Sequence, residues 1–363
     1  MIDRQQTGNI DWILIGLLIL ISAIGVAFIY SSSHYLAKNY YMKQILWIVV
    51  SLVALLIFLF IDYHFLVEYS IYIYILFLII LICILFFGNF TAGAKSWIKF
   101  SFFKVQPSEL MKVIIILLLA RIFSGYRKKY ITLKKGFLSV AVVFFPVLLT
   151  ALQPDLGTAL IFIPILLASL ILAGINKKTF VFLLIFIILV SGLSWHFLLK
   201  DYQKERLTTL VSPEKDPLGS GYQILQSKIA IGSGGLLGKG YKKGTQSQLR
   251  FLPARHTDFI LSVIGEELGF IGVTIVLIIY FLFIYRLFQS ILKSRDRTGV
   301  YIIFMVAVMV SAQFFINVLM TIGLFPISGI PLPLLSYGGS SLLSNYLAIS
   351  LVLNVKMRRF ANI

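Results

Sequence analysis

Long apolar runs follow one another along this chain and are separated by short polar stretches. Ten of the runs have about the 20 residues that a helix needs to cross a bilayer. The pattern predicts an all-α polytopic membrane protein with about ten transmembrane helices, in which residues 1–363 form a single membrane domain. The expected spans lie near residues 11–31, 43–61, 69–88, 108–124, 136–152, 157–175, 178–198, 257–286, 300–323 and 338–356.

Composition agrees with a membrane protein. Hydrophobic residues make up 59% of the chain, whereas soluble domains are about 45–50% apolar, and the mean hydropathy is +0.96. The first run begins at Trp12 without the basic segment and cleavage site of a removable signal peptide, so we expect a retained helix. The single cysteine, Cys83, lies within an apolar run, which predicts a buried packing role and excludes an intramolecular disulfide.

Basic residues in the short loops predict the direction in which the chain crosses the membrane. On one side they cluster within 127–135, 177–178, 293–297 and 356–359, whereas the short loops of the other side carry isolated lysines. Because basic loops stay in the cytoplasm, we expect both termini inside and the long loop 199–256 outside. The expected location is the plasma membrane, crossed many times.

The net charge of +18 arises largely from the inner loops, where topology and attraction to anionic membrane lipid explain it. The outer loop has ten Lys or Arg residues against four acids, a net charge of +6 that topology does not require. This charge fits an anionic partner such as a lipid phosphate, or it merely solvates the loop. Nucleic acid is not expected as a partner, because no basic soluble domain exists.

Asp258 lies where the long polar loop meets an apolar run, and a charged group at such a place is a functional candidate. The functional interpretation is a general base at the outer membrane surface. The alternative is structural: Thr257 caps the helix, and an acid in the first turn suits the helix dipole. Glu266 and Glu267 lie about two turns further along at different angles, so a structural role is expected for at least one.

A second polar group opens the fourth run, where Ser108 is a candidate cap. Glu109 precedes Lys112 by three residues, so the two can form a partly buried ion pair on one helix face. Such a pair is usually structural, although Lys112 is also placed to meet a phosphate. Asp155, between the fifth and sixth runs, and Lys95 are expected on the same outer face as Asp258.

The long loop contains a glycine-rich stretch, residues 232–240. It is not a nucleotide-binding P-loop, because Ser233 stands at the first glycine position and Gly240 replaces the Ser or Thr. Its backbone N–H groups could bind a phosphate, or the stretch is a flexible turn. The preceding residues 224–231 predict a short interfacial helix with an apolar face formed by Ile224, Leu225 and Ile229.

The last apolar run follows Pro331 and Pro333, whose spacing forbids a regular helix. The small residues 338–341 that come next allow close approach of a backbone or a lipid chain. The four histidines are scattered, and no Cys/His cluster has metal-ligand spacing. The sequence therefore predicts no metal site.

Together these motifs resemble the SEDS family (shape, elongation, division and sporulation) over essentially the whole chain. Within it, residues 244–249 and 251–253 and the short tails look most like the elongation branch rather than the division or sporulation branches. The resemblance rests on six motifs in the expected order, at residues 106–109, 153–159, 216–222, 228–235, 256–269 and 331–341.

The resemblance implies a ten-helix peptidoglycan glycosyltransferase that polymerises lipid II outside the plasma membrane. It also implies a class B penicillin-binding protein and other elongation-complex membrane proteins as partners. The family's essential aspartate falls on Asp258 and its ion pair on Glu109 and Lys112. An arginine is common in the family where Lys43 stands, and lysine keeps the charge but loses bidentate phosphate binding.

The resulting hypothesis is an inverting transfer. Asp258 removes the proton from the acceptor 4-hydroxyl, that oxygen attacks the anomeric carbon of the donor, and undecaprenyl pyrophosphate leaves. Basic side chains would stabilise the anionic leaving group, and the hypothesis allows a divalent cation at the pyrophosphate, although no ligand cluster demands one. The expected substrate-binding residues are Lys43, Lys95, Glu109, Lys112, Asp155, Arg206, Lys239, Arg255, His256 and Ser340.

Two rival functions are weighed against this hypothesis. A lipid II flippase would favour ionisable groups near the membrane midplane, often in paired repeats. The carboxylates here are expected at outer helix ends, and no convincing repeat is found. A non-catalytic scaffold for the penicillin-binding partner would need Asp258 for stability alone.

Overall fold

The computed structural model describes residues 10–34, 39–87, 89–91, 94–99, 104–126, 130–176 and 219–358, together with the single positions 181, 185, 209, 210, 212 and 216. The twelve helices of these segments are α2 (Trp12–Ser33), α3 (Tyr40–Phe60), α4 (Tyr63–Glu68), α5 (Ser70–Phe87), α6 (Pro107–Ser124), α7 (Leu133–Leu152), α8 (Leu156–Ala173), α11 (Ser220–Gly234), α12 (Thr245–Gln248), α13 (Ile260–Ile291), α14 (Arg297–Thr321) and α15 (Gly339–Met357).

The all-α prediction is confirmed, and nine of the ten predicted runs coincide with helices. The predicted span 178–198 lies outside the described residues. Among the described helices, seven are long and apolar enough to cross a membrane, namely α2, α3, α5, α7, α8, α13 and α14. The chain is therefore a multi-pass membrane protein.

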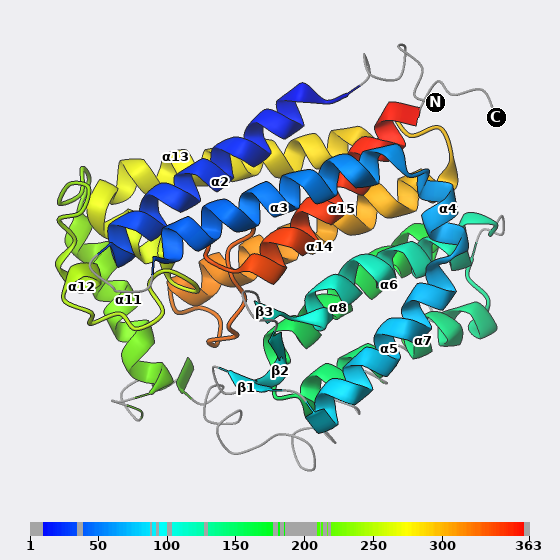
Figure 1. Ribbon diagram of the computed structural model, residues 1–363, viewed down its shortest axis with the longest axis horizontal. Helices are drawn as coiled ribbons and strands as arrows, with labels where there is room; N and C mark the ends of the chain where they lie inside the picture. The colour runs from blue at the N-terminus through cyan, green and yellow to red at the C-terminus, as the bar shows by residue number, and fades with distance from the viewer. Residues whose placement is uncertain are drawn as a thin grey trace.

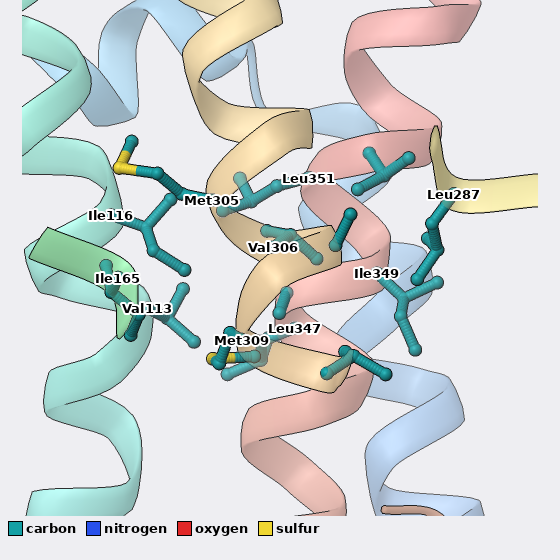
Figure 2. Close-up of a cluster of buried hydrophobic side chains, with 14 of the residues drawn as sticks. Val113, Ile116, Ile165, Leu287, Met305, Val306, Met309, Leu347, Ile349 and Leu351 are labelled. Atoms are coloured by element: carbon teal, nitrogen blue, oxygen red, sulfur yellow. The ribbon is translucent and has the colours of Figure 1, made fainter. Parts of the chain in front are cut away.

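The two long helices that are more polar, α6 and α15, lie inside the bundle. Every residue of α15 is buried except Gly339 and Leu343, and α6 is buried over most of its length. Figure 2 shows their core side chains meeting those of α14, with Val113 and Ile116 on one side of Met305 and Met309 and Leu347 on the other. A helix surrounded by other helices can carry Ser, Asn and charged residues because its neighbours, rather than lipid, surround them.

The helices form two groups that lie side by side (Figure 1). One group contains α2, α3, α13, α14 and α15, and the other contains α5, α6, α7 and α8; α14 packs against both α6 and α8. Segments α11 and α12 gather at one end of the bundle, called here the loop end. The other end, where α15 finishes, is called the terminal end.

Lipid-facing surface explains the wrong prediction for the cysteine. Cys83 lies on α5 and is exposed rather than buried. In a membrane protein an apolar residue satisfies its environment equally well against lipid, so an apolar run does not indicate burial.

A small antiparallel sheet, which the sequence did not predict, joins α5 to α6. Its strands are β1 (Asn89–Thr91), β2 (Ala94–Lys99) and β3 (Lys104–Val105), in the order β1-β2-β3. The register pairs Asn89 with Trp97 and Ile98 with Val105. These strands are too short to give a clear alternating pattern in the sequence.

The segment before α15 has no regular helix, as the prolines predict. The small residues that follow do allow a close approach: a Cβ on Gly339 would lie 2.1 Å from the Trp47 indole. Gly25 of α2 is equally tight, since its Cβ would lie 2.3 Å from the backbone oxygen of Leu335. The segment therefore sits wedged between α2 and α3.

Helix α11 forms where the short helix was predicted, and the face that it buries against the protein consists mostly of small residues. The buried residues are Gly221, Ile224, Ser227, Ala230 and Gly234, whereas Leu225 and Ile229 are exposed. Small residues occupy the buried face because α11 packs closely on α13. Helix α13 is interrupted at Gly269, where φ is 66° and ψ is −162°.

Candidate active site

Asp258 lies in the turn before α13 and is partly exposed. The structural alternative for this residue is wrong in its details, because Phe259 is the N-cap and no side chain caps the helix. The Thr257 hydroxyl instead donates to the Ala254 carbonyl at 3.2 Å. Thr257 is therefore not the cap, and Asp258 precedes the first turn of α13 rather than lying in it.

The backbone of Asp258 is held by Asn317, a fully buried residue of α14. The Asn317 Nδ2 donates to the Asp258 carbonyl at 2.9 Å and to the Ile330 carbonyl at 2.8 Å. The sequence patterns did not predict a role for Asn317. Its signal was a strong amide donor within an apolar span, where such a group needs a partner.

His256 lies against two aromatic rings. Its ring centroid is 4.5 Å from that of Tyr40 and 5.9 Å from that of Tyr337, whose backbone N–H donates to the His256 carbonyl at 2.9 Å. Burial, together with the adjacent Arg255 charge, lowers the pKa of His256 to about 4. The imidazole is therefore neutral at neutral pH, and it cannot serve there as a cation for a phosphate.

The predicted ion pair of α6 is confirmed. The Lys112 Nζ lies 2.6 Å from the Glu109 Oε2, and both side chains are buried. The cap prediction is wrong, since Gln106 is the N-cap and Pro107 occupies the first helical position. The Ser108 hydroxyl instead points to the Asp155 carboxylate at 3.4 Å.

Asp155 joins the start of α8 to the start of α6. Its carboxylate accepts from the Thr158 backbone N–H at 3.2 Å, as an N-cap, and from the Gln106 side-chain amide. Burial raises the pKa of Asp155, and the nearby Glu109 carboxylate acts in the same direction. The Gln106 backbone N–H also donates to the Ser340 hydroxyl at 2.9 Å, so Ser340 belongs to this group.

One segment, residues 328–341, connects the two groups of polar residues. It contacts His256 through Tyr337, Asn317 through Ile330 and Gln106 through Ser340. Its start is also tight against α8, because a Cβ on Gly157 would lie 2.1 Å from the Ser328 carbonyl oxygen. This segment therefore links the turn that carries His256 and Asp258 to the start of α6, which carries Glu109 and Lys112.

Two of the predicted binding residues fasten the long loop to the bundle. Lys239 pairs with the buried Glu266 at 2.9 Å, and that carboxylate also accepts from the backbone of Gln246 and Ser247. Arg255 is buried and donates to the Ser32 carbonyl at 2.8 Å. The structural role expected for at least one of the glutamates is found at Glu266.

For the three remaining predicted residues, the described part of the chain gives no contact with the groups above. Lys43 is exposed in the first turn of α3, and Lys95 lies in β2, where only its backbone is described. Arg206 lies outside the described residues. Within the described ranges, no group of three or more His, Cys, Asp or Glu side chains is placed to hold a metal ion.

The fold and the buried charges define a class: a polytopic, all-α membrane protein with polar side chains joined across helices at the loop end. The chain belongs to the FtsW/RodA/SpoVE family of cell cycle proteins, whose family model matches residues 10–360. The resemblance to the SEDS family is thereby confirmed.

Several curated relatives match over most of their length. The peptidoglycan glycosyltransferase MrdB of Escherichia coli (strain K12) is 39% identical over 288 residues, covering 79% of this chain and 78% of the relative. Stage V sporulation protein E of Bacillus subtilis is 34% identical over 355 residues, with 95% and 96% covered. The peptidoglycan glycosyltransferase RodA of Treponema pallidum is 33% identical over 431 residues, with 98% and 99% covered.

Solved structures match the whole fold. A chain of a peptidoglycan synthase complex that coordinates polymerization and crosslinking superposes with a TM-score of 0.83 at 32% identity, covering 97% of this chain and 99% of that one. The rod shape determining protein RodA of Thermus thermophilus gives a TM-score of 0.73 at 26% identity, with 97% and 98% covered. Relatives and solved structures named RodA are among the matches, and FtsW relatives match at similar identity.

Proposed function

We propose that this chain is a peptidoglycan glycosyltransferase that polymerises lipid II into glycan strands during cell elongation. The observation that carries the proposal is the family match over residues 10–360, together with relatives that are named peptidoglycan glycosyltransferases. The partly exposed carboxylate of Asp258, on a backbone fixed from α14, supplies a base for the reaction. The proposal places the chain in the plasma membrane, with both termini in the cytoplasm and polymerisation at the outer face. It also treats residues 1–363 as a single domain, with 199–256 as its outer loop.

The proposed reaction inverts the anomeric centre. The Asp258 carboxylate takes the proton of the acceptor 4-hydroxyl while that oxygen attacks the donor anomeric carbon, and undecaprenyl pyrophosphate leaves with the bonding electrons. A base that is held in place can act without reorganisation. The Asp258 backbone carbonyl accepts one hydrogen bond from Asn317, and the same Asn317 amide donates to the Ile330 carbonyl. The neutral His256 beside it adds no competing positive charge at neutral pH.

The anionic leaving group needs positive charge nearby. Lys112 is a buried cation of the site and pairs with Glu109. We assign it to the donor pyrophosphate, with Glu109 as its resting partner. Asp155 and Ser340 position the start of α6 around this pair. Lys43, Lys95, Arg206, Lys239, Arg255 and His256 remain predicted contacts.

A class B penicillin-binding protein is the proposed partner. Support comes from the similar chain found in a complex that coordinates polymerization and crosslinking. A glycan strand made by this chain would be the substrate for such crosslinking. Other elongation-complex membrane proteins are proposed as further partners.

The test is polymerisation of labelled lipid II by the purified chain with its penicillin-binding partner, whose own activities are blocked. Asp258→Asn keeps the side-chain volume and removes the base, so we expect polymer formation to fall by roughly 10²–10⁴-fold. Glu68→Gln is the matched control, because Glu68 is an exposed carboxylate of α4 at the terminal end. Thermal unfolding verifies that each variant is folded.

The outcomes separate the candidate functions. Polymer from wild type and Glu68→Gln, with none from folded Asp258→Asn, supports the transferase and its base. Full activity of Asp258→Asn would show that another group is the base. Absence of polymer from every variant, with lipid II moving across liposomes, would favour the flippase, and absence of both activities would favour the scaffold.

A further inference from the structure

The glycine-rich stretch forms a tight turn over the interruption in α13. We call residues Gly235–Gly240 the leucine turn. The Phe270 N–H donates to the Gly235 carbonyl at 2.8 Å, and the Ile271 N–H donates to the Leu236 carbonyl at 3.2 Å. These bonds satisfy backbone donors that the break at Gly269 frees, so the turn and the break form one unit.

Neither of the two sequence interpretations of this stretch fits the structure. The N–H groups of Gly238, Lys239 and Gly240 donate to the carbonyls of residues 234, 266 and 267 at 2.8–3.0 Å, so they are already used within the protein. The turn is also packed tightly against α13, because a Cβ on Gly238 would lie 2.2 Å from the Glu267 carbonyl oxygen. It is therefore neither a phosphate loop nor a loose connection.

The turn presents two large apolar side chains away from the protein. Leu236 is 70% exposed and Leu237 is 79% exposed. They adjoin Phe270 and Ile271, which are 65% and 47% exposed. A contiguous exposed apolar surface of this kind indicates contact with a membrane or a partner. The surface continues along the exposed face of α13 through Ile275, Ile278, Phe281 and Leu282.

The depth of this surface can be derived from the terminal end of α13. There Arg286 pairs with Asp11, which begins the first membrane span, so the pair marks the polar boundary on that side. Arg286 is the sixteenth residue after Phe270, so the two are about 24 Å apart along the helix at 1.5 Å per residue. The hydrocarbon core is about 30 Å thick, and any tilt of the helix brings Phe270 deeper still.

Charge and aromatic residues beside the turn fit the edge of the same layer. The Lys242 Nζ lies 4.0 Å from the centroid of the Tyr30 ring, and the Tyr241 hydroxyl donates to the Ala27 carbonyl at 2.7 Å. Lys and Tyr side chains favour the interface between hydrocarbon and headgroups. Lys242 thus lies where headgroup phosphates would meet it, with Leu236 and Leu237 on the hydrocarbon side.

We propose that the leucine turn inserts Leu236 and Leu237 into the acyl chains of the bilayer leaflet at the loop end. The partner is the bulk membrane lipid. The inserted turn anchors the interruption of α13, and through Lys239 and Glu266 it fixes the following loop at the membrane surface. This inference is independent of the proposed function.

The test measures lipid contact directly. Cys83 is replaced by Ser, since it is an exposed cysteine on a membrane helix, and Leu237→Cys carries a fluorophore in vesicles containing phospholipids with nitroxide-labelled acyl chains. Ile278→Cys is the lipid-facing reference and Lys243→Cys the polar control; both positions are exposed. The same variants are titrated with aqueous iodide, and thermal unfolding verifies their fold.

We expect nitroxide lipid to reduce the fluorescence at 237 as strongly as at 278, and more strongly than at 243, with little effect of iodide at 237. Quenching at 237 by iodide alone would overturn the proposal, because the turn would then lie in water. Shielding from both quenchers would also overturn it, since protein rather than lipid would cover the leucines. Leu236→Cys repeats the measurement at a second position.

Discussion

At the scale of single residues, buried amides fasten the ends of helices. Asn317 holds the turn that carries Asp258, and Asn354 of α15 donates to the carbonyls of Phe58 and Ile61 at the end of α3. Helix ends leave carbonyl groups without partners inside the helix, and within a membrane protein a buried amide can satisfy them. Such residues are recognisable as isolated polar residues within apolar runs, but the sequence does not show which helix end each one contacts.

His256 gives a pH-dependent prediction. Its pKa is about 4 in the folded protein, whereas an unperturbed histidine has a pKa of about 6.5. Between these values the unfolded chain binds the proton and the folded chain does not, so this contribution lowers stability as the pH falls from about 6.5 to about 4. We expect the thermal midpoint in detergent to fall less on acidification for His256→Gln than for wild type. Equal pH dependence of the two proteins would contradict the assignment.

At the scale of elements, glycines decide how closely α11 packs on α13. A Cβ on Gly234 would lie 1.9 Å from the Gly265 carbonyl oxygen, whereas a Cβ on Gly232 meets nothing within 4 Å. Both glycines lie in the last turn of α11, although Gly234 is its final residue, so helix propensity is expected to matter less at Gly234 than at Gly232. The contact distance, rather than the residue type, therefore distinguishes the two positions.

This pair supplies a matched test. Gly232→Ala should raise the free energy of unfolding by up to about 1 kcal/mol, because alanine favours the helix. Gly234→Ala should lower it by about 1–3 kcal/mol, because the new methyl group forces α11 from α13. Thermal and denaturant unfolding in detergent measure both. Equal effects of the two substitutions would show that the close approach contributes nothing.

At the scale of the whole molecule, one carboxylate joins three helices at the terminal end. Asp11 caps α2 and accepts hydrogen bonds from Arg286 of α13 and from Lys356 of α15. Arg286 and Lys356 lie 275 and 345 residues after Asp11 in the sequence. The ends of α2, α13 and α15 meet at the terminal end (Figure 1), and this packing brings the three charges together. Asp62 also pairs with a cation, Arg358, but its side chain is 44% exposed.

Asp11→Asn should strongly destabilise the bundle. Asparagine retains the cap but removes the charge, which leaves the buried Lys356 without its counter-ion, at a cost of about 3–5 kcal/mol. Asp62→Asn is the control, and we expect it to change the free energy of unfolding by about 0–1 kcal/mol because water screens the pair. Unfolding midpoints of both variants test this. A stable Asp11→Asn protein would show that the three-helix contact is dispensable.

Features that depend on neighbouring residues along the chain could be predicted from the sequence alone. The length of the apolar runs located the spans, the i, i+3 spacing located the Glu109–Lys112 pair, and the prolines marked the irregular segment before α15. Each of these follows from the geometry of one helix, which repeats with a fixed rise and angle. The family motifs added Asp258, whose role is a proposal.

Contacts between segments that are distant in the sequence could not be predicted from local patterns, and they became known from the folded structure. It placed Asn317 beneath Asp258, Ser340 beside Gln106 and the leucine turn over the break in α13. It also showed that Cys83 is exposed, because hydropathy does not distinguish a side chain that faces lipid from one that faces another helix. Packing made that distinction, since small residues, rather than the most apolar ones, permit helices to approach closely.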